Sequence, residues 1–301
     1  RTSRIMLKQI VIISGKGGTG KTIFTASLAA LASRKVMVDC DVDAADLHLL
    51  LNPRIVETHE FRGGKTARID PALCIACGRC AESCRFDAIR EDADTFVVDP
   101  LACEGCGLCA RICPVEAVAM EEHLSGEWYR SETAYGPFVH AKLGIAQENS
   151  GKLVACIREA AKTIARSLDL DYVIIDGPPG IGCPVLASLT DTDLAVIVTE
   201  PSLSGIHDAR RVIELARHFR IPAGIVINKW DINPEQSRKI EELCSEGVSL
   251  LGRIPFSKQV AASLIRARPY VETAQDDVAA AIRAAWEKID SEPAGKDRRP
   301  S

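Results

Sequence analysis

Two groups of residues in this 301-residue sequence have types and spacings that suit chemistry. The first is one octapeptide that follows the mostly apolar residues 9–13: Gly15, Lys16, Gly17, Gly18, Thr19, Gly20, Lys21 and Thr22. Its pattern, G-x-x-x-x-G-K-[ST], is a P-loop, in which glycines let successive backbone N–H groups point at phosphate oxygens. Lys21 would meet the β- and γ-phosphates, and Thr22 would offer its hydroxyl to Mg²⁺. The sequence therefore predicts a nucleotide site, with a helix N-terminus behind it that favours the same anion.

The second group is a set of eight cysteines arranged as an internal repeat. The first run is Cys74, Cys77, Cys80 and Cys84, and the second, 29 positions on, is Cys103, Cys106, Cys109 and Cys113. Two copies of C-x₂-C-x₂-C-x₃-C are the pattern of bacterial two-cluster ferredoxins. Zinc is the alternative, but zinc sites favour separated cysteine pairs, whereas three cysteines in close succession suit the corners of a cubane. We expect two [4Fe–4S] clusters.

The ferredoxin pattern also implies how the eight thiolates are shared. In it, the fourth cysteine of each run ligates the other cluster. The resemblance assigns Cys74, Cys77, Cys80 and Cys113 to one cluster, and Cys84, Cys103, Cys106 and Cys109 to the other. Cys113 is followed by Pro114, as the pattern has it, but Cys84 is followed by Arg85. We expect this cation to shift the potential of the second cluster without removing a ligand.

The elements around the P-loop predict an α/β fold with a doubly wound, mostly parallel sheet. Buried strands are expected over residues 9–13, 35–38, 171–176, 194–198 and 223–227, and helices over 153–168, 206–219 and 273–289. Carboxylates that end such strands lie beside the phosphate site. Asp176 has the Walker B position, from which it reaches Mg²⁺ through water. Asp39, Asp41 and Asp43 end the strand at 35–38, with Asp39 and Asp43 expected to support the loop.

The cysteine repeat interrupts this α/β pattern and suggests the domain organisation. We expect an N-terminal part of the ATPase domain over residues 1–62, an inserted small α+β ferredoxin domain of bacterial type over 63–122, and the rest of the ATPase domain over 123–290. Residues 123–150 suggest strands and turns that return the chain to the sheet, and the polar residues 291–301 suggest a disordered tail.

A second lysine in the loop, Lys16, is not required by an ordinary P-loop. With it, the loop resembles the deviant Walker A motif of the MinD/ParA/Mrp ATPases, and Gly177-Pro178-Pro179-Gly180 resembles the switch II loop of Mrp-type proteins. The resemblance implies a nucleotide-dependent homodimer in which Lys16 reaches the partner's phosphates. It also implies that Asp41 is the switch I aspartate, which helps to hold Mg²⁺ and orients the attacking water. Lys16, Lys21 and Asp41 are then the catalytic residues, and Thr22, Asp41 and Asp176 the magnesium site.

The base of the nucleotide is expected at Asn228-Lys229-Trp230-Asp231. This tetrapeptide has the N-K-x-D form that reads guanine in small GTPases, but in the MinD-like ATPases the corresponding asparagine contacts adenine. Ile254-Pro255-Phe256 resembles the second base-contacting turn of those ATPases. We therefore expect Asn228, Lys229 and Pro255 to bind ATP and ADP, with GTP as the alternative.

The composition of the chain limits the classes of partner and the cellular compartment that we expect. The net charge of −4 and pI of about 5.9 give no basic excess, so neither nucleic acid nor a membrane surface is expected as a partner. The sequence shows no run of about 18 apolar residues and no signal segment. Met6 is expected to be the native start. We expect the protein in the cytosol, where twelve cysteines favour metal binding over disulfides. The acidic helix at 273–289 is expected to dock on the core. Cys183, near the switch II loop, is either a transient ligand or a small buried residue at a helix start, and the second reading is favoured.

These observations together suggest an ATPase that forms ADP and phosphate, slowly without a partner. The resemblance implies a dimer switch coupled to electron delivery or cluster transfer, toward a client metalloprotein or a cluster-assembly protein, in metal-cofactor or iron–sulfur assembly. One alternative is an ATP-gated reductase that passes only electrons. Another is a spatial organiser that binds membrane or DNA, as MinD and ParA do.

Overall fold

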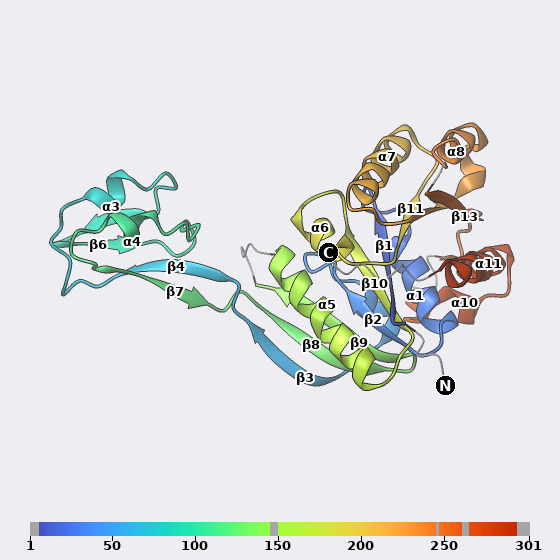
Figure 1. The fold of residues 1–301 in the computed structure, drawn as a ribbon, viewed down its shortest axis with the longest axis horizontal. Helices are drawn as coiled ribbons and strands as arrows, with labels where there is room; N and C mark the ends of the chain where they lie inside the picture. Colours follow the sequence, from blue (N-terminus) through green and yellow to red (C-terminus); the bar gives the residue numbers. More distant parts are fainter. Residues whose placement is uncertain (1–5, 145–149, 245–246, 261–264, 294–301) are drawn as a thin grey trace. The chain divides into compact units, whose positions relative to one another are not determined.

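A computed structural model of the chain describes residues 6–144, 150–244, 247–260 and 265–293. They form two compact units (Figure 1). Within the described residues, the first unit comprises residues 6–59, 128–142, 150–244, 247–260 and 265–293, and the second comprises residues 60–127, 143 and 144. The second unit is thus wider than the predicted insertion at 63–122. The predicted start at Met6 and most of the predicted tail concern residues 1–5 and 294–301, which lie outside the described residues.

The first unit is built on a nine-stranded sheet with the order β13-β12-β11-β1-β10-β2-β9-β8-β3. Its strands are β1 (Lys8–Ser14), β2 (Lys35–Asp39), β3 (Arg54–Phe61), β8 (Gly126–Thr133), β9 (Gly136–Leu143), β10 (Tyr172–Pro179), β11 (Leu194–Thr199), β12 (Ala223–Asn228) and β13 (Val248–Ile254). The strands from β13 to β9 pair in parallel. The inner strands β1, β11 and β12 read as nearly continuous apolar runs because both faces of a parallel sheet are buried. The predicted α/β fold with a mostly parallel sheet is confirmed.

Helices cover both faces of this sheet. One layer contains α1 (Lys21–Leu31), α2 (Leu47–Leu51), α10 (Tyr270–Thr273) and α11 (Asp277–Ser291), and it shares one apolar core with the strands. The other contains α5 (Ser150–Ser167), α6 (Cys183–Leu189) and α7 (Leu203–His218). Between β12 and β13 lie the short η1 (Trp230–Ile232) and α8 (Pro234–Glu241). This two-sided cover defines the doubly wound arrangement.

The three predicted helices and the strands expected within residues 123–150 agree with the structure except at one helix start. The helices predicted at 153–168 and 206–219 are α5 and α7, and the strands expected within 123–150 are β8 and β9, next to β2. The single helix predicted at 273–289 is wrong at its start. α10 ends at Thr273, and α11 begins after Asp276, whose carboxylate accepts a hydrogen bond from the Ala279 N–H at 3.0 Å. Asp276 is therefore an N-cap and not a helical residue.

The docking face of α11 is as the sequence suggests. Val278, Ile282, Ala285 and Ile289 are buried in the core, and Trp286 packs partly against it. The apolar face of this helix is covered within the unit.

The second unit shows the sequence repeat as a structural repeat. Its elements are β4 (Gly64–Ile69) paired antiparallel with β7 (Val118–His123), β5 (Ile89–Asp92) paired antiparallel with β6 (Thr95–Val98), α3 (Arg79–Glu82) and α4 (Leu108–Ile112). In the first half, the Cys74 N–H donates to the Asp70 carbonyl at 3.0 Å, and in the second the Cys103 N–H donates to the Asp99 carbonyl at 3.1 Å. Each Asp-Pro turn thus starts one cysteine run in the same way.

Candidate functional site

The phosphate loop of the first unit connects β1 to α1. It runs from Gly15 to Gly20, between the central strand of the sheet and the N-terminus of the helix. A Cβ atom at Gly20 would lie 2.3 Å from the Asn228 amide nitrogen, and its φ of 90° is left-handed. Glycine is required here for both reasons. The hydroxyl of Thr19 in the same loop is buried and has no hydrogen-bond partner among the described residues. A phosphate oxygen would satisfy such an orphaned group.

Three of the predicted residues meet at the end of this loop. The Lys21 ammonium lies 2.9 Å from an Asp176 carboxylate oxygen, and the Thr22 hydroxyl donates to the other oxygen at 2.9 Å. Burial lowers the pKa of Lys21, but the charge and hydrogen bond of Asp176 outweigh it, so the pKa lies above its usual value. Lys21 is therefore a permanent cation at the loop.

Two further carboxylates gather beside Lys21. An Asp41 oxygen lies 3.9 Å from its ammonium, and burial raises the pKa of Asp41 to about 6. Asp39 is fully buried, its pKa is raised by that burial and by Asp176, and it accepts hydrogen bonds from the Asp41 and Leu47 N–H groups at 3.1 Å. Asp39 therefore supports the loop, as the sequence suggested, whereas Asp41 is free to face a ligand.

These oxygens suit magnesium. Mg²⁺ is bound by one or two carboxylates, retained waters and substrate phosphates, and less often by a complete set of protein ligands. Among the described residues, no three His, Cys, Asp or Glu side chains converge closely enough to hold a metal ion by themselves. Thr22, Asp41 and Asp176 offer the partial oxygen set that a magnesium–nucleotide complex requires.

Lys16 has different surroundings from Lys21. Its ammonium lies 2.7 Å from a Glu200 oxygen and donates to the hydroxyls of Ser202 and Ser204 at 3.2 and 2.9 Å. The other Glu200 oxygen lies 3.1 Å from the Lys229 ammonium. Burial raises the pKa of Glu200, but the two lysines outweigh it, so the pKa is lowered. In this structure, Lys16 is held by the segment after β11.

Glu200, Ser202 and Ser204 were not among the residues predicted for the site. The available signal was the position of Glu200 directly after the buried strand β11. The contact with Lys16 depends on how α7 is placed against the loop, so strand position alone could not assign it.

The predicted base-binding residues come together at the same edge. Asn228 donates its side-chain N–H to the Thr19 carbonyl at 2.7 Å, and Lys229 approaches the Gly18 carbonyl at 3.4 Å. Asp231 accepts a hydrogen bond from the Phe256 N–H at 2.7 Å, which ties this tetrapeptide to the turn that contains Pro255. The carboxylate that reads guanine in an N-K-x-D motif is thus already engaged with backbone, which is consistent with adenine.

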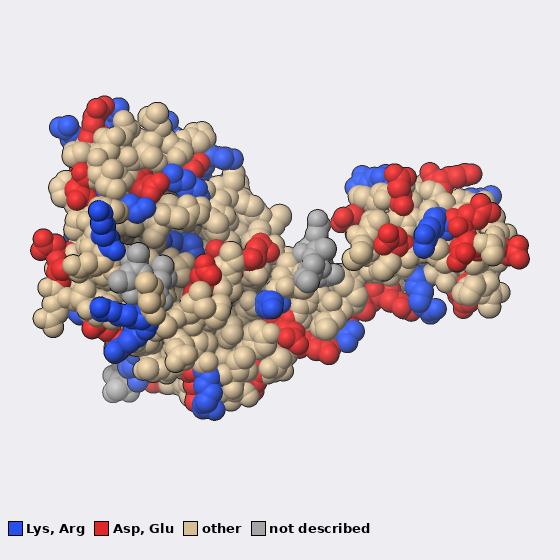
Figure 2. Space-filling model, turned by 180° about the vertical axis from the view of Figure 1, so that it is seen from behind, with Lys and Arg blue, Asp and Glu red and all other residues tan. Residues whose placement is uncertain are grey.

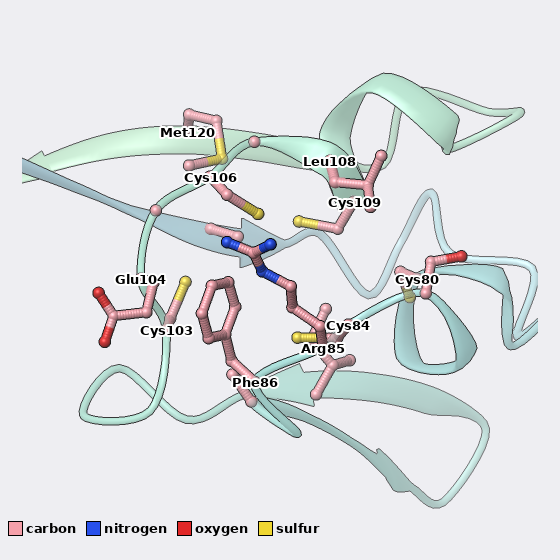
Figure 3. Close-up of a pocket in the computed structure, with 16 residues that line it drawn as sticks. Cys80, Cys84, Arg85, Phe86, Cys103, Glu104, Cys106, Leu108, Cys109 and Met120 are labelled. Atoms are coloured by element: carbon pink, nitrogen blue, oxygen red, sulfur yellow. The ribbon is translucent and has the colours of Figure 1, made fainter.

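In the second unit, the eight repeated cysteines line two cavities. One, of about 300 Å³, is lined by Cys80, Cys84, Cys103, Cys106 and Cys109 (Figure 3). The other, of about 20 Å³, is lined by Cys74, Cys77, Cys80 and Cys113. Apart from Cys80, which lines both, the first cavity combines the last cysteine of one run with the first three of the other, and the second cavity does the reverse. This is the grouping that the ferredoxin pattern implies.

The chemistry of these donor sets fits iron–sulfur clusters. In a cubane each thiolate binds a different iron, so the sulfurs surround the cluster and need not converge on one ion. The Cys113 sulfur accepts a hydrogen bond from the Ala117 N–H at 3.3 Å. This contact stabilises a thiolate. The volume of the larger cavity also leaves room for a cluster. At the smaller cavity, only the set of four cysteine donors supports a cluster.

The four other cysteines lie in the first unit. Cys40 is buried, which raises its pKa strongly, and Cys156 and Cys244 are half-buried with pKa values raised by burial. Cys183 is exposed at the first position of α6. The favoured interpretation of Cys183 as a buried residue is wrong, since the side chain at this helix start points away from the core.

Comparison with known proteins defines the class to which this fold and loop belong. The family model described as CobQ/CobB/MinD/ParA nucleotide binding domain matches residues 10–270. The chain therefore belongs to this family of P-loop proteins.

Individual relatives agree with this assignment. The "Uncharacterized protein MJ0578" of Methanocaldococcus jannaschii is 37% identical over 231 residues, which are 76% of this chain and 80% of the relative. The putative septum site-determining protein MinD of Chlorella vulgaris is 26% identical over 283 residues, 89% of this chain and 79% of the relative. The fold is similar to MinD of Pyrococcus horikoshii in complex with Mg-ADP, with a TM-score of 0.59, 19% identity, and coverage of 95% of this chain and 97% of the other.

The helices and the surface charges of the described residues show two further features. None of the helices in the described ranges is long and apolar enough to cross a membrane. On the face drawn in Figure 2, lysine and arginine side chains are interspersed with acidic ones on each unit.

Proposed function

We propose that this protein is an ATPase with two [4Fe–4S] clusters, whose nucleotide-dependent dimer switch gates electron delivery or cluster transfer to a client metalloprotein or cluster-assembly protein. The observation that carries the proposal is that eight repeated cysteines line two cavities in the exchanged grouping, on a chain that also has a complete P-loop. Its context would be metal-cofactor or iron–sulfur cluster assembly, as the resemblance implies.

The ATPase half of the proposal assigns a task to each charged group. Lys21 moves from Asp176 to the β- and γ-phosphates, which leaves Asp176 and Thr22 to orient the magnesium ion and its waters. Asp41 accepts a hydrogen bond from the attacking water. Lys16 leaves Glu200 and stabilises charge on the phosphates of the second copy, as an arginine finger does. ATP would thereby close a homodimer, and hydrolysis to ADP and phosphate would open it.

The cysteine half of the proposal assigns each repeated thiol to one cluster. Cys74, Cys77, Cys80 and Cys113 would hold one cluster, and Cys84, Cys103, Cys106 and Cys109 the other. Each cluster, when bound, supplies one-electron transfer. Since all eight thiolates are then used, a transferred cluster would need further ligands, and the exposed Cys183 is the candidate.

Metal analysis tests the cluster assignment. Anaerobically purified chain should contain about eight iron and about eight sulfide per polypeptide. The Cys77→Ser variant should lose about half of both, with ATP affinity near that of the wild type, because Cys77 lies in the other compact unit. Zinc without sulfide would overturn the proposal.

A reductase that passes only electrons differs from a cluster carrier in its iron balance. Iron retained at full stoichiometry through many ATP turnovers, in the presence of an acceptor protein, would favour the reductase. Loss of iron to that acceptor in step with ATP hydrolysis would favour the carrier.

A second candidate function is favoured by the comparisons. Several relatives are named septum site-determining proteins, which suggests a spatial organiser that binds a surface in its ATP state. The burial of the apolar face of α11 and the net charge of −4 disfavour a membrane or DNA surface. Sedimentation with anionic liposomes or DNA, with ATP and with ADP, decides between them, since ATP-dependent co-sedimentation is expected only of the organiser.

A further inference from the structure

One side chain in the larger cysteine cavity has no counterpart in the repeat. Arg85 follows Cys84 at the position that Pro114 holds after Cys113. Its side chain extends into the cavity lined by Cys103, Cys106 and Cys109 (Figure 3). The guanidinium carbon lies 4.8 Å from the centroid of the Phe86 ring, which supports it from below.

Arg85 is not neutralised by a neighbour. Over the described ranges, it takes part in neither an ion pair nor a hydrogen bond. The other charged residue that lines this cavity is Glu104, whose carboxylate points away from Arg85 (Figure 3). The remaining lining is mostly apolar, and Arg85 itself is exposed, so its charge reaches the thiols partly through solvent and partly across apolar side chains.

We propose that Arg85 is a positioning and tuning residue for the cluster held by Cys84, Cys103, Cys106 and Cys109, and that it raises the reduction potential of that cluster. The inference rests on the proposed function. Reduction adds one electron to a cluster that is already anionic with its four thiolates. A guanidinium directed at the site stabilises the added charge, and net charge and hydrogen bonds to sulfur are two of the determinants of such potentials.

The chain offers a matched control in the other cavity. Arg79 lines the smaller cavity, at the start of α3. Arg79→Gln removes the same charge as Arg85→Gln but beside the other cysteine set. Arg85→Lys keeps the charge and removes the planar fork of N–H donors.

The experiment is a redox titration with dithionite, followed by electron paramagnetic resonance, on wild type, Arg85→Gln, Arg85→Lys and Arg79→Gln, each with its iron and sulfide content. In Arg85→Gln the midpoint potential of the cluster held by Cys84, Cys103, Cys106 and Cys109 should fall, and the midpoint potential of the other cluster should not change. In Arg79→Gln the midpoint potential that falls in Arg85→Gln should stay at its wild-type value. Arg85→Lys should lie nearer to the wild type than Arg85→Gln does.

Three results would overturn the inference. They are an unchanged or raised midpoint in Arg85→Gln at full iron content, an equal fall of both midpoints, or an Arg85→Lys midpoint as low as that of Arg85→Gln. Wild-type chain without iron and sulfide would instead overturn the proposed function, so the two failures are distinguishable.

Discussion

At the scale of single residues, the two lysines of the phosphate loop are held in different ways. Lys21 is almost fully buried against Asp176, whereas the side chain of Lys16 retains 31% exposure and is paired with Glu200. A lysine that must act within its own site is best fixed there, and one that must reach a second copy is best held at the rim by contacts that can break. The arrangement agrees with the two roles proposed for them.

Replacing Lys16 tests the role across the dimer. Lys16→Ala should abolish ATP-dependent dimerisation, measured by sedimentation velocity with a non-hydrolysable ATP analogue, and should leave the iron content unchanged. Lys239→Ala removes an exposed lysine from α8 and serves as the control, with dimerisation retained. A Lys16→Ala dimer that forms with ATP as readily as the wild type would contradict the role.

At the scale of elements, the sequence predicted the strands and cysteine runs that depend on residues close together in the chain. The buried parallel strands and the cysteine runs were readable from apolar residues and from the 29-residue spacing. The start of α11 was not, because Asp276 looks like one more acid in a charged helix until its carboxylate is seen to cap Ala279. The neighbouring places of β3 and β8 were not readable either, since the whole cysteine repeat separates them in the chain.

The hairpin of β8 and β9 contains a buried histidine that should make stability depend on pH. Burial, with a smaller effect of His48, lowers the pKa of His140 to about 4, and its ring nitrogen contacts the Ser131 hydroxyl at 3.0 Å. Between pH 4 and the unfolded pKa of about 6.5, the unfolded chain binds the extra proton, so stability should fall as pH falls.

His140→Gln should remove this contribution. Its unfolding free energy, from urea titrations at several pH values, should depend less steeply on pH between about 4 and 6.5, by at most about 1.4 kcal/mol per pH unit. His218→Gln, on α7, is the matched control for replacing a histidine elsewhere in the same unit. An unchanged slope in His140→Gln would show that His140 is not the group that titrates.

The loop between Cys103 and Cys106 gives a test of the second unit. A Cβ at Gly105 would lie 2.1 Å from the Lys65 carbonyl oxygen of β4, whereas one at Gly107 would meet nothing within 4 Å. Both residues have left-handed φ angles, 63° and 72°, so both alanine variants carry backbone strain of about 1–2 kcal/mol. Only Gly105→Ala should displace the loop and lose iron, measured as iron per chain, and equal iron contents in the two variants would contradict this packing.

At the scale of the whole molecule, the topology gives a covalent route between the two sites. Asp41 follows β2, the chain then runs through α2 and β3 into the second unit, and it returns through β8 and β9, with β9 paired to β2. A movement of Asp41 on nucleotide exchange would act on strands next to the one that leads to the cysteines. This route offers a physical basis for the coupling that we propose between the nucleotide and the clusters.

The most direct test of this coupling compares the midpoint potentials of the clusters in the ADP state and with a non-hydrolysable ATP analogue, in wild type and in Lys16→Ala. We expect at least one midpoint to differ between the two nucleotide states in the wild type. The difference should disappear in Lys16→Ala, because that variant is expected not to close the dimer. Equal midpoints in both states, in a wild-type protein that is fully loaded with iron and dimeric with the ATP analogue, would contradict this coupling.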